Sequence, residues 1–115
     1  MDRHELAWAA GFFDGEGWAA RKKPRGVGAQ INQADMNGVP AALVRFQAAL
    51  GGVGTMGGPY RKPGCQDLYS WTVSSRDDVV LVLQLLRPWL GPVKLLQLAS
   101  ATGAVAPAQA EGSGG

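Results

Sequence analysis

The sequence has 115 residues, of which 46% are hydrophobic and 17% charged, and this composition predicts one folded domain rather than a disordered chain or a multidomain enzyme. The single cysteine excludes an intrachain disulfide framework, and the single histidine argues against a Cys/His zinc site and excludes histidine-dependent hydrolysis. The remaining possibilities are catalysis by carboxylates or binding without catalysis. The net charge of the chain is +2.

The first predicted element is a helix over residues 5–13 that is apolar around its circumference. Ala7, Gly11 and Gly15 share one face, with Trp8 and Phe12 beside it. A helix without a polar face must be buried on all sides, which a small single-layer domain does not achieve alone. Because small residues four apart let helix backbones approach closely, we expect this face to pack against a second copy of the chain. The alternative is an ordinary core helix that contains glycines.

Next come two extended stretches, 18–23 and 27–33, which flank a Lys-Pro-Arg-Gly turn and predict a hairpin. A second helix opens near Pro40 and ends at Gly51 and Gly52. Its predicted apolar side contains Leu43, Val44, Phe46 and Leu50.

A second pair of strands, 53–56 and 68–73, follows, joined by a glycine- and proline-rich loop. Ser75 caps a third helix that runs to Pro88, and a last helix spans the region from Val93 to Gly103. The order αββαββα plus a short helix predicts an α+β fold with helices on one face of an antiparallel sheet and the other face open. We expect residues 1–103 to form the domain and residues 104–115 a disordered tail.

Basic residues concentrate in the middle of the sequence. Between Gly17 and Arg76 there are eight basic residues and two acidic ones, which gives this stretch a net charge of +6. Such clustering is typical of proteins that bind a polyanion, and the alternative is a solvated positive surface.

The segment Ala9-Ala10-Gly11-Phe12-Phe13-Asp14-Gly15-Glu16-Gly17 resembles the signature of the LAGLIDADG homing endonucleases, with alanine in place of the first leucine and Glu16 in place of the second aspartate. The resemblance in element order covers roughly residues 4–102. Since the motif occurs once, the chain resembles the single-motif branch, which acts as a homodimer. This agrees with the self-association expected from the first helix.

The resemblance implies that Glu16 from each of two subunits lies at the floor of a saddle and binds a divalent metal, with the Gly15 carbonyl as a further ligand. Two close carboxylates repel unless a cation lies between them, and Mg²⁺ or Mn²⁺ prefers such oxygen donors. Asp14 is interpreted as structural, near the dimer interface or bonded to backbone amides. The alternative for Glu16 is a solvated acid at a helix end.

Two further catalytic residues follow from the resemblance. Gln33 matches a polar residue that positions solvent at the metal, and Lys94 matches a basic residue near the scissile phosphate, although it could also be an ordinary surface lysine. Relatives often carry another basic residue soon after the position of Gln33, whereas residues 34–38 contain none. This departure favours slow or lost cleavage.

We expect DNA to bind the open face of the sheet. Alternation from Glu16 places Trp18, Ala20 and Lys22 on this face, and the opposite phase would place Arg21 and Lys23 there. The alternation of Tyr69 and Trp71 predicts that one is buried and the other exposed. The predicted DNA-binding residues are Arg21, Lys22, Lys23, Arg25, Gln30, Asn32, Tyr60, Arg61, Lys62 and Tyr69.

The resulting hypothesis is a metal-dependent double-strand DNA endonuclease that acts as a homodimer on a near-palindromic site, with no membrane partner and no small-molecule substrate. The alternatives are a non-cleaving nucleic-acid binder, such as an intron RNA maturase or a regulator, and a small basic interaction module. The sequence contains no apolar run of membrane-spanning length and no signal peptide, so a cytoplasmic location is expected.

Overall fold

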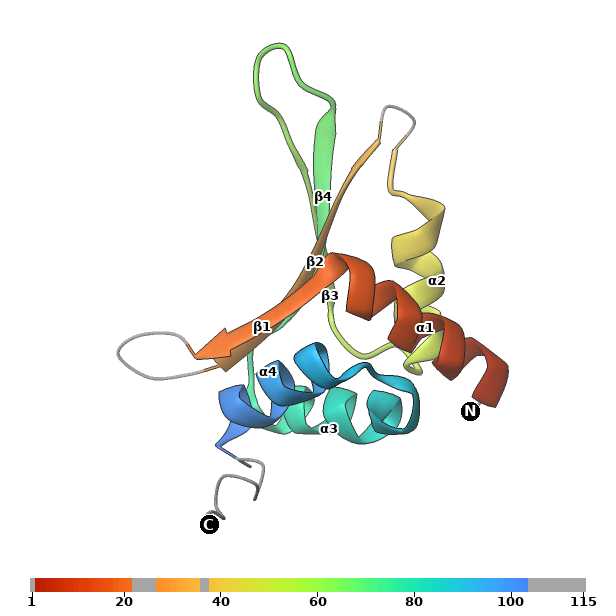
Figure 1. Cartoon of the computed structure of the whole chain (residues 1–115). Helices are drawn as coiled ribbons and strands as arrows, with labels where there is room; N and C mark the ends of the chain where they lie inside the picture. The colour runs from red at the N-terminus through yellow and green to blue at the C-terminus, as the bar shows by residue number, and fades with distance from the viewer. Residues whose placement is uncertain (1, 22–26, 36–37, 104–115) are drawn as a thin grey trace.

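The computed structural model describes residues 2–21, 27–35 and 38–103, and these form the α+β fold expected from the sequence (Figure 1). The elements are, in chain order, α1 (Arg3–Glu16), β1 (Gly17–Arg21), β2 (Val27–Asp35), α2 (Ala41–Ala49), β3 (Thr55–Tyr60), β4 (Asp67–Val73), α3 (Arg76–Leu86), the 3₁₀ helix η1 (Arg87–Trp89) and α4 (Pro92–Thr102). The predicted helix–strand order is therefore confirmed, with η1 as an addition. None of the described helices combines the length and the apolar character needed to cross a membrane.

The four strands form one antiparallel sheet in the order β1-β2-β4-β3, and the helices gather on one of its faces (Figure 1). Gln30 on β2 lies opposite Trp18 on β1 and Thr72 on β4, so one row of side chains crosses the open face. The pairing of β3 with β4 shifts register between Gly57 and Tyr60. The sheet thus offers one open face, as the sequence predicts.

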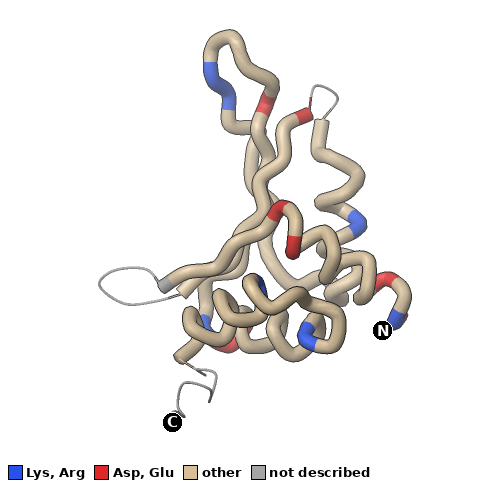
Figure 2. Tube along the Cα trace, viewed as in Figure 1, with Lys and Arg blue, Asp and Glu red and all other residues tan. Residues whose placement is uncertain are grey.

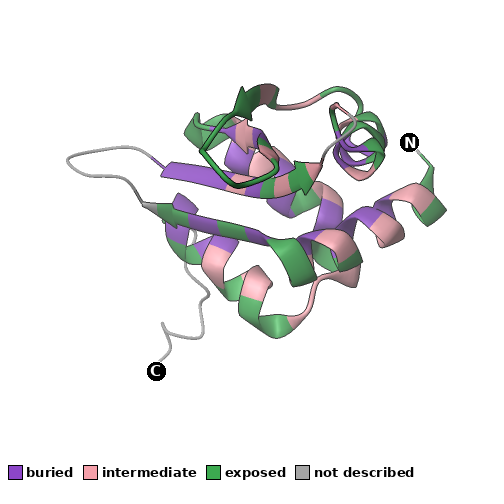
Figure 3. Cartoon of the chain, turned by 90° about the horizontal axis from the view of Figure 1, so that it is seen from above, coloured by how far each residue is buried: buried purple, intermediate pink, exposed green. Residues whose placement is uncertain are grey.

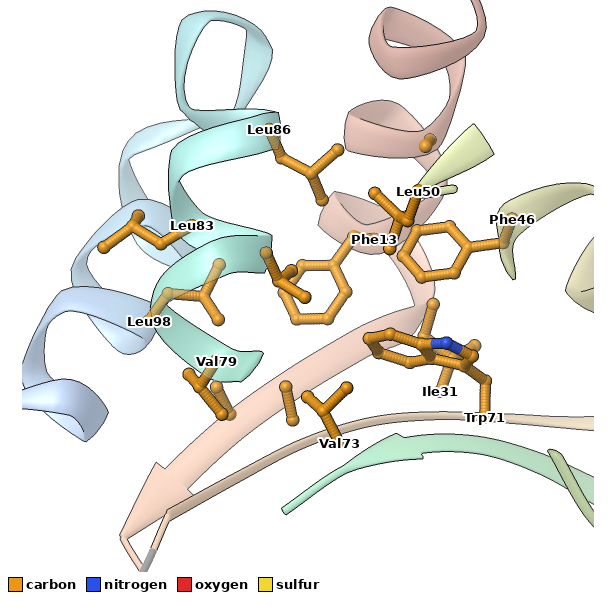
Figure 4. Packing of buried hydrophobic residues seen from close by; sticks show 14 of the residues in the cluster. Phe13, Ile31, Phe46, Leu50, Trp71, Val73, Val79, Leu83, Leu86 and Leu98 are labelled. Atoms are coloured by element: carbon orange, nitrogen blue, oxygen red, sulfur yellow. The ribbon is translucent and has the colours of Figure 1, made fainter. Parts of the chain in front are cut away.

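The core lies between the sheet and the helices (Figures 3 and 4). Phe13 from α1 and Phe46 from α2 stack at a centroid distance of 6.3 Å, and Phe46 meets the Trp71 ring of β4 edge-on at 4.7 Å. The Trp71 indole N–H donates to the Val53 carbonyl at 2.9 Å, so its one polar atom is paired inside the core. α1 is thereby fixed to the sheet through the face opposite Gly11.

A capping residue explains where α1 begins, and the helix also extends beyond its predicted end. The Asp2 carboxylate accepts hydrogen bonds from the backbone N–H groups of His4 and Glu5, and these bonds lower the pKa of Asp2. At the other end the helix continues through Gly15 to Glu16, and a Cβ atom at Gly17 would overlap the Phe13 ring. Glycine is thus required for the close contact between the strand start and the core.

Three further sequence predictions differ from the structure. β3 extends to Tyr60, through part of the predicted loop. Val44 is 51% exposed, because only Leu43, Phe46 and Leu50 of its predicted group face the sheet. Tyr69 and Trp71 are both buried, since residues two apart in a strand point to the same face, and the expectation that one is exposed is wrong. The predicted tail, 104–115, lies outside the described residues.

Candidate functional site

The predicted catalytic acid and amide come together at the end of α1. Glu16 is the last residue of that helix and is exposed, while Gln33 is half-buried near the end of β2. The Gln33 side-chain amide donates to Glu16 Oε1 at 2.9 Å. The structure therefore brings two predicted site residues, 17 positions apart, into direct contact.

Asp14 is occupied by a structural contact. Both of its carboxylate oxygens accept the backbone N–H of Gly91, at 2.8 and 3.1 Å. This bears out its interpretation as a residue bonded to a backbone amide. Lys94, half-buried, lies in the first turn of α4, directly after that contact.

The residues that the resemblance assigns to metal binding carry hard oxygen donors, which suit Mg²⁺. Glu16 supplies a carboxylate, and Gly15 lies in the last turn of α1, where helix carbonyls have no intrahelical partner. In the described part of the chain, no three His, Cys, Asp or Glu side chains form a metal-binding group. Glu16 and the Gly15 carbonyl are therefore the two donors that this site offers from one copy of the chain.

The face of α1 that is predicted to contact a second copy is open. Gly11 and Gly15 are exposed, and a Cβ atom added at either would meet no atom within 4 Å. Trp8 and Phe12 are half-buried beside them and stack in parallel, with ring centroids 5.2 Å apart. The small-residue face of Ala7, Gly11 and Gly15 is thus flat and bordered by an aromatic pair.

An ion pair supports the outer side of this aromatic pair. Arg45 from α2 lies 4.0 Å from the centre of the Trp8 ring and forms two hydrogen bonds with the Glu5 carboxylate, at 2.7 and 2.9 Å. The hydrogen bond from Arg45 lowers the pKa of Glu5, and the same bond raises the pKa of Arg45. Arg45 therefore belongs to the α1–α2 contact rather than to the open sheet face.

The open face of the sheet is polar but uncharged in its described centre. Trp18 and Ala20 are exposed there, which confirms the predicted strand phase. Gln30 and Asn32 lie on the same face, and the Gln30 amide donates to Asn32 Oδ1 at 2.8 Å. Tyr69 points to the core instead and cannot contact DNA from this face, so its assignment as a DNA-binding residue is corrected. The predicted contacts Lys22, Lys23 and Arg25 lie outside the described residues, as does the side chain of Arg21.

The described basic residues near the open face lie in the loop between β3 and β4 (Figure 2). Tyr60, Arg61 and Lys62 are exposed, and Arg61 pairs with Asp67 at 3.5 Å. They line a surface hollow together with Gln66, which sequence reasoning misses because a single loop glutamine carries no periodic signal. The basic residues between Gly17 and Arg76 therefore do not form one continuous surface. Arg76, at the end of this stretch, donates instead to the Thr102 carbonyl, between α3 and α4.

The sequence matches no protein-family model, and no curated protein matches it. Solved structures do match. The homing endonuclease I-CvuI, in complex with its target in the presence of 2 mM Ca, is 20% identical with a TM-score of 0.64, and the match covers 88% of this chain and 65% of that chain. The LAGLIDADG meganuclease I-AabMI, bound to uncleaved DNA, is 18% identical with a TM-score of 0.63, with coverage of 100% and 39%. The described chain has the fold of the LAGLIDADG homing endonucleases.

Proposed function

We propose that the chain is a site-specific DNA endonuclease of the homing type that acts as a homodimer with Mg²⁺ or Mn²⁺. The observation that carries this proposal is the position of Glu16, an exposed carboxylate at the end of a helix whose small-residue face is open. Packing that face against its copy in a second subunit would bring the two Glu16 side chains together. The solved structures of similar fold that are bound to DNA support the same reading.

The proposed chemistry divides between the two subunits. Glu16 and the Gly15 carbonyl of each subunit would hold the metal, which, when bound, activates a water molecule and stabilises the leaving oxygen of a phosphodiester. Gln33 donates to Oε1 of Glu16 and so orients the carboxylate, whose second oxygen would face the metal. The positive charge of Lys94 stabilises the negative charge that develops on the phosphate in the transition state. One site per DNA strand, related by a twofold axis, gives a double-strand break at a near-palindromic sequence.

DNA recognition would use the open sheet face. Gln30 and Asn32 present amide groups of the kind that read adenine in the major groove, and Trp18 offers a flat apolar surface beside them. Arg61 and Lys62 lie at one end of the sheet, where basic loops contact phosphates. Base reading and phosphate binding are thus assigned to different parts of the surface.

A non-cleaving nucleic-acid binder is the second candidate, favoured by the absence of a basic residue in positions 34–38. The endonuclease and the non-cleaving binder are distinguished by incubating the protein with random-sequence duplex DNA and Mg²⁺ and sequencing the ends produced. We expect defined double-strand ends with the wild type and none with Glu16→Gln, which keeps the side-chain shape and removes the charge. Asp77→Asn, which removes an exposed carboxylate from the first turn of α3, is the matched control and should cleave normally. Unchanged cleavage by Glu16→Gln would refute the proposal, and binding without cleavage by the wild type would support the second candidate.

A further inference from the structure

The contact between Asp14 and Gly91 joins two helices that are distant in the sequence. The Asp14 carboxylate is half-buried and receives the Gly91 N–H with both oxygens, at 2.8 and 3.1 Å. A Cβ atom at residue 91 would lie 3.3 Å from Asp14 Oδ2, which is tighter than an ordinary contact. Glycine at this position therefore permits the close approach of the carboxylate.

The start of α4 has no capping side chain of its own. Its N-cap residue is Gly91, its first residue is Pro92, and its first turn contains no acidic residue. The N-terminus of a helix carries unpaired N–H groups and a partial positive charge, which an anion stabilises. Asp14 of α1 supplies that anion from another helix.

This contact links the two helices that carry proposed catalytic groups. Asp14 lies two residues before Glu16 on α1, and the Gly91 that it holds lies three residues before Lys94 on α4. The Gly91 carbonyl in turn accepts the N–H of Leu95, which closes the first turn of α4 around Lys94. A shift of Asp14 would therefore move the first turn of α4 relative to the end of α1.

We propose that Asp14 is a positioning residue that sets the location of Lys94 relative to Glu16, an inference that rests on the proposed nuclease function. Both of its oxygens are engaged by Gly91, so it acts through the backbone of α4 rather than on DNA or metal. Small displacements of a reacting group lower rates strongly, because the bound geometry must match the transition state.

The test measures single-turnover cleavage, with Mg²⁺, of a duplex recovered from the random-sequence library. We expect Asp14→Ala to slow cleavage by about 100-fold, as for a misplacement on the order of 1 Å, while affinity for the same duplex in Ca²⁺ stays within about twofold. Asp14→Asn keeps an acceptor oxygen for the Gly91 N–H and should restore most of the rate. Gly91→Ala, which crowds the carboxylate without a backbone change, should give an intermediate rate.

A double-mutant cycle with Lys94→Met separates positioning from general destabilisation. If Asp14 acts through Lys94, the double variant Asp14→Ala/Lys94→Met cleaves as fast as Lys94→Met alone. Multiplied losses, or a loss of binding equal to the loss of rate, would overturn the proposal. Hydrogen exchange at residues 91–95 should be faster in Asp14→Ala than in the wild type, with α3 unchanged, and unaltered exchange would also overturn it. Absence of wild-type cleavage would refute the nuclease function itself, whereas wild-type cleavage with a normal Asp14→Ala rate would refute only the positioning role.

Discussion

Replacing Gly11 with alanine should have opposite effects on the folded monomer and on the proposed dimer. Gly11 lies inside α1, is exposed, and has no atom within 4 Å of the position a Cβ would take. Alanine is favoured over glycine in a helix interior by about 1 kcal/mol. The isolated domain should therefore gain about 1 kcal/mol, which corresponds to a rise in Tm of about 4 °C for a domain of this size.

In the dimer the same methyl group would stand between two helix backbones. Overpacking of a close contact costs about 1–3 kcal/mol, so the dimer dissociation constant should rise by about 5- to 150-fold. Sedimentation over a concentration series measures this constant, and thermal unfolding at concentrations well below it measures the monomer. Gln84→Ala, on an exposed position of α3, is the control and should leave self-association unchanged. A Gly11→Ala protein that is more stable and dimerises and cleaves DNA as before would refute the assignment of this face as the interface.

Three further outcomes are expected. Gly17→Ala should lower the free energy of unfolding by about 1–3 kcal/mol in urea titrations, because its methyl group would overlap the Phe13 ring, and an unchanged midpoint would contradict the close contact. Because Arg45 lowers the pKa of Glu5 below its usual 4.5, that carboxylate stabilises the fold above pH 4.5 and loses this effect as the pH falls through its lowered pKa. Glu5→Gln should therefore unfold with a weaker pH dependence in this window, and parallel curves for the two proteins would contradict the ion pair. Lys62→Ala should reduce the slope of log affinity for duplex DNA against log salt by about 0.9 for each phosphate that the lysine neutralises, and an equal slope would place Lys62 away from the DNA backbone.

The order of elements can be predicted because local signals are strong in this sequence. Ser75 accepts the N–H of Asp78, as a capping residue does, and the glycines after α2 end that helix within one residue of expectation. Glu16 and Gln33 can be paired only through the motif, since nothing local links positions so far apart. The helix boundary at Glu16 escapes prediction because propensity places glycine at helix ends, whereas in the structure the backbone N–H of Gly17 still bonds to the Phe13 carbonyl and α1 continues through Gly15.

The charge pattern of the sequence predicts the position of residues in the structure less well than the local signals predict the order of elements. Net charge along the sequence does not show which face a residue joins, and in the structure Arg45 pairs with Glu5 while Arg76 bonds to α4. The contact of Asp14 with Gly91 is equally hidden, because a carboxylate and a backbone amide far apart in the chain leave no joint sequence signal. Side-chain placement in three dimensions, rather than composition, decides these roles.

The two borders of the sheet are poorly suited to the addition of another strand. Along β3 the ladder is interrupted between Gly57 and Tyr60, and Pro59 has no N–H with which to bind an incoming strand. Along β1 the N–H of Ala19 is already taken by the Gln97 side chain of α4, at 3.3 Å. At these positions the sheet offers an incomplete template to an incoming strand, so a second copy that associates with this chain, as proposed, would meet less competition from edge-to-edge pairing.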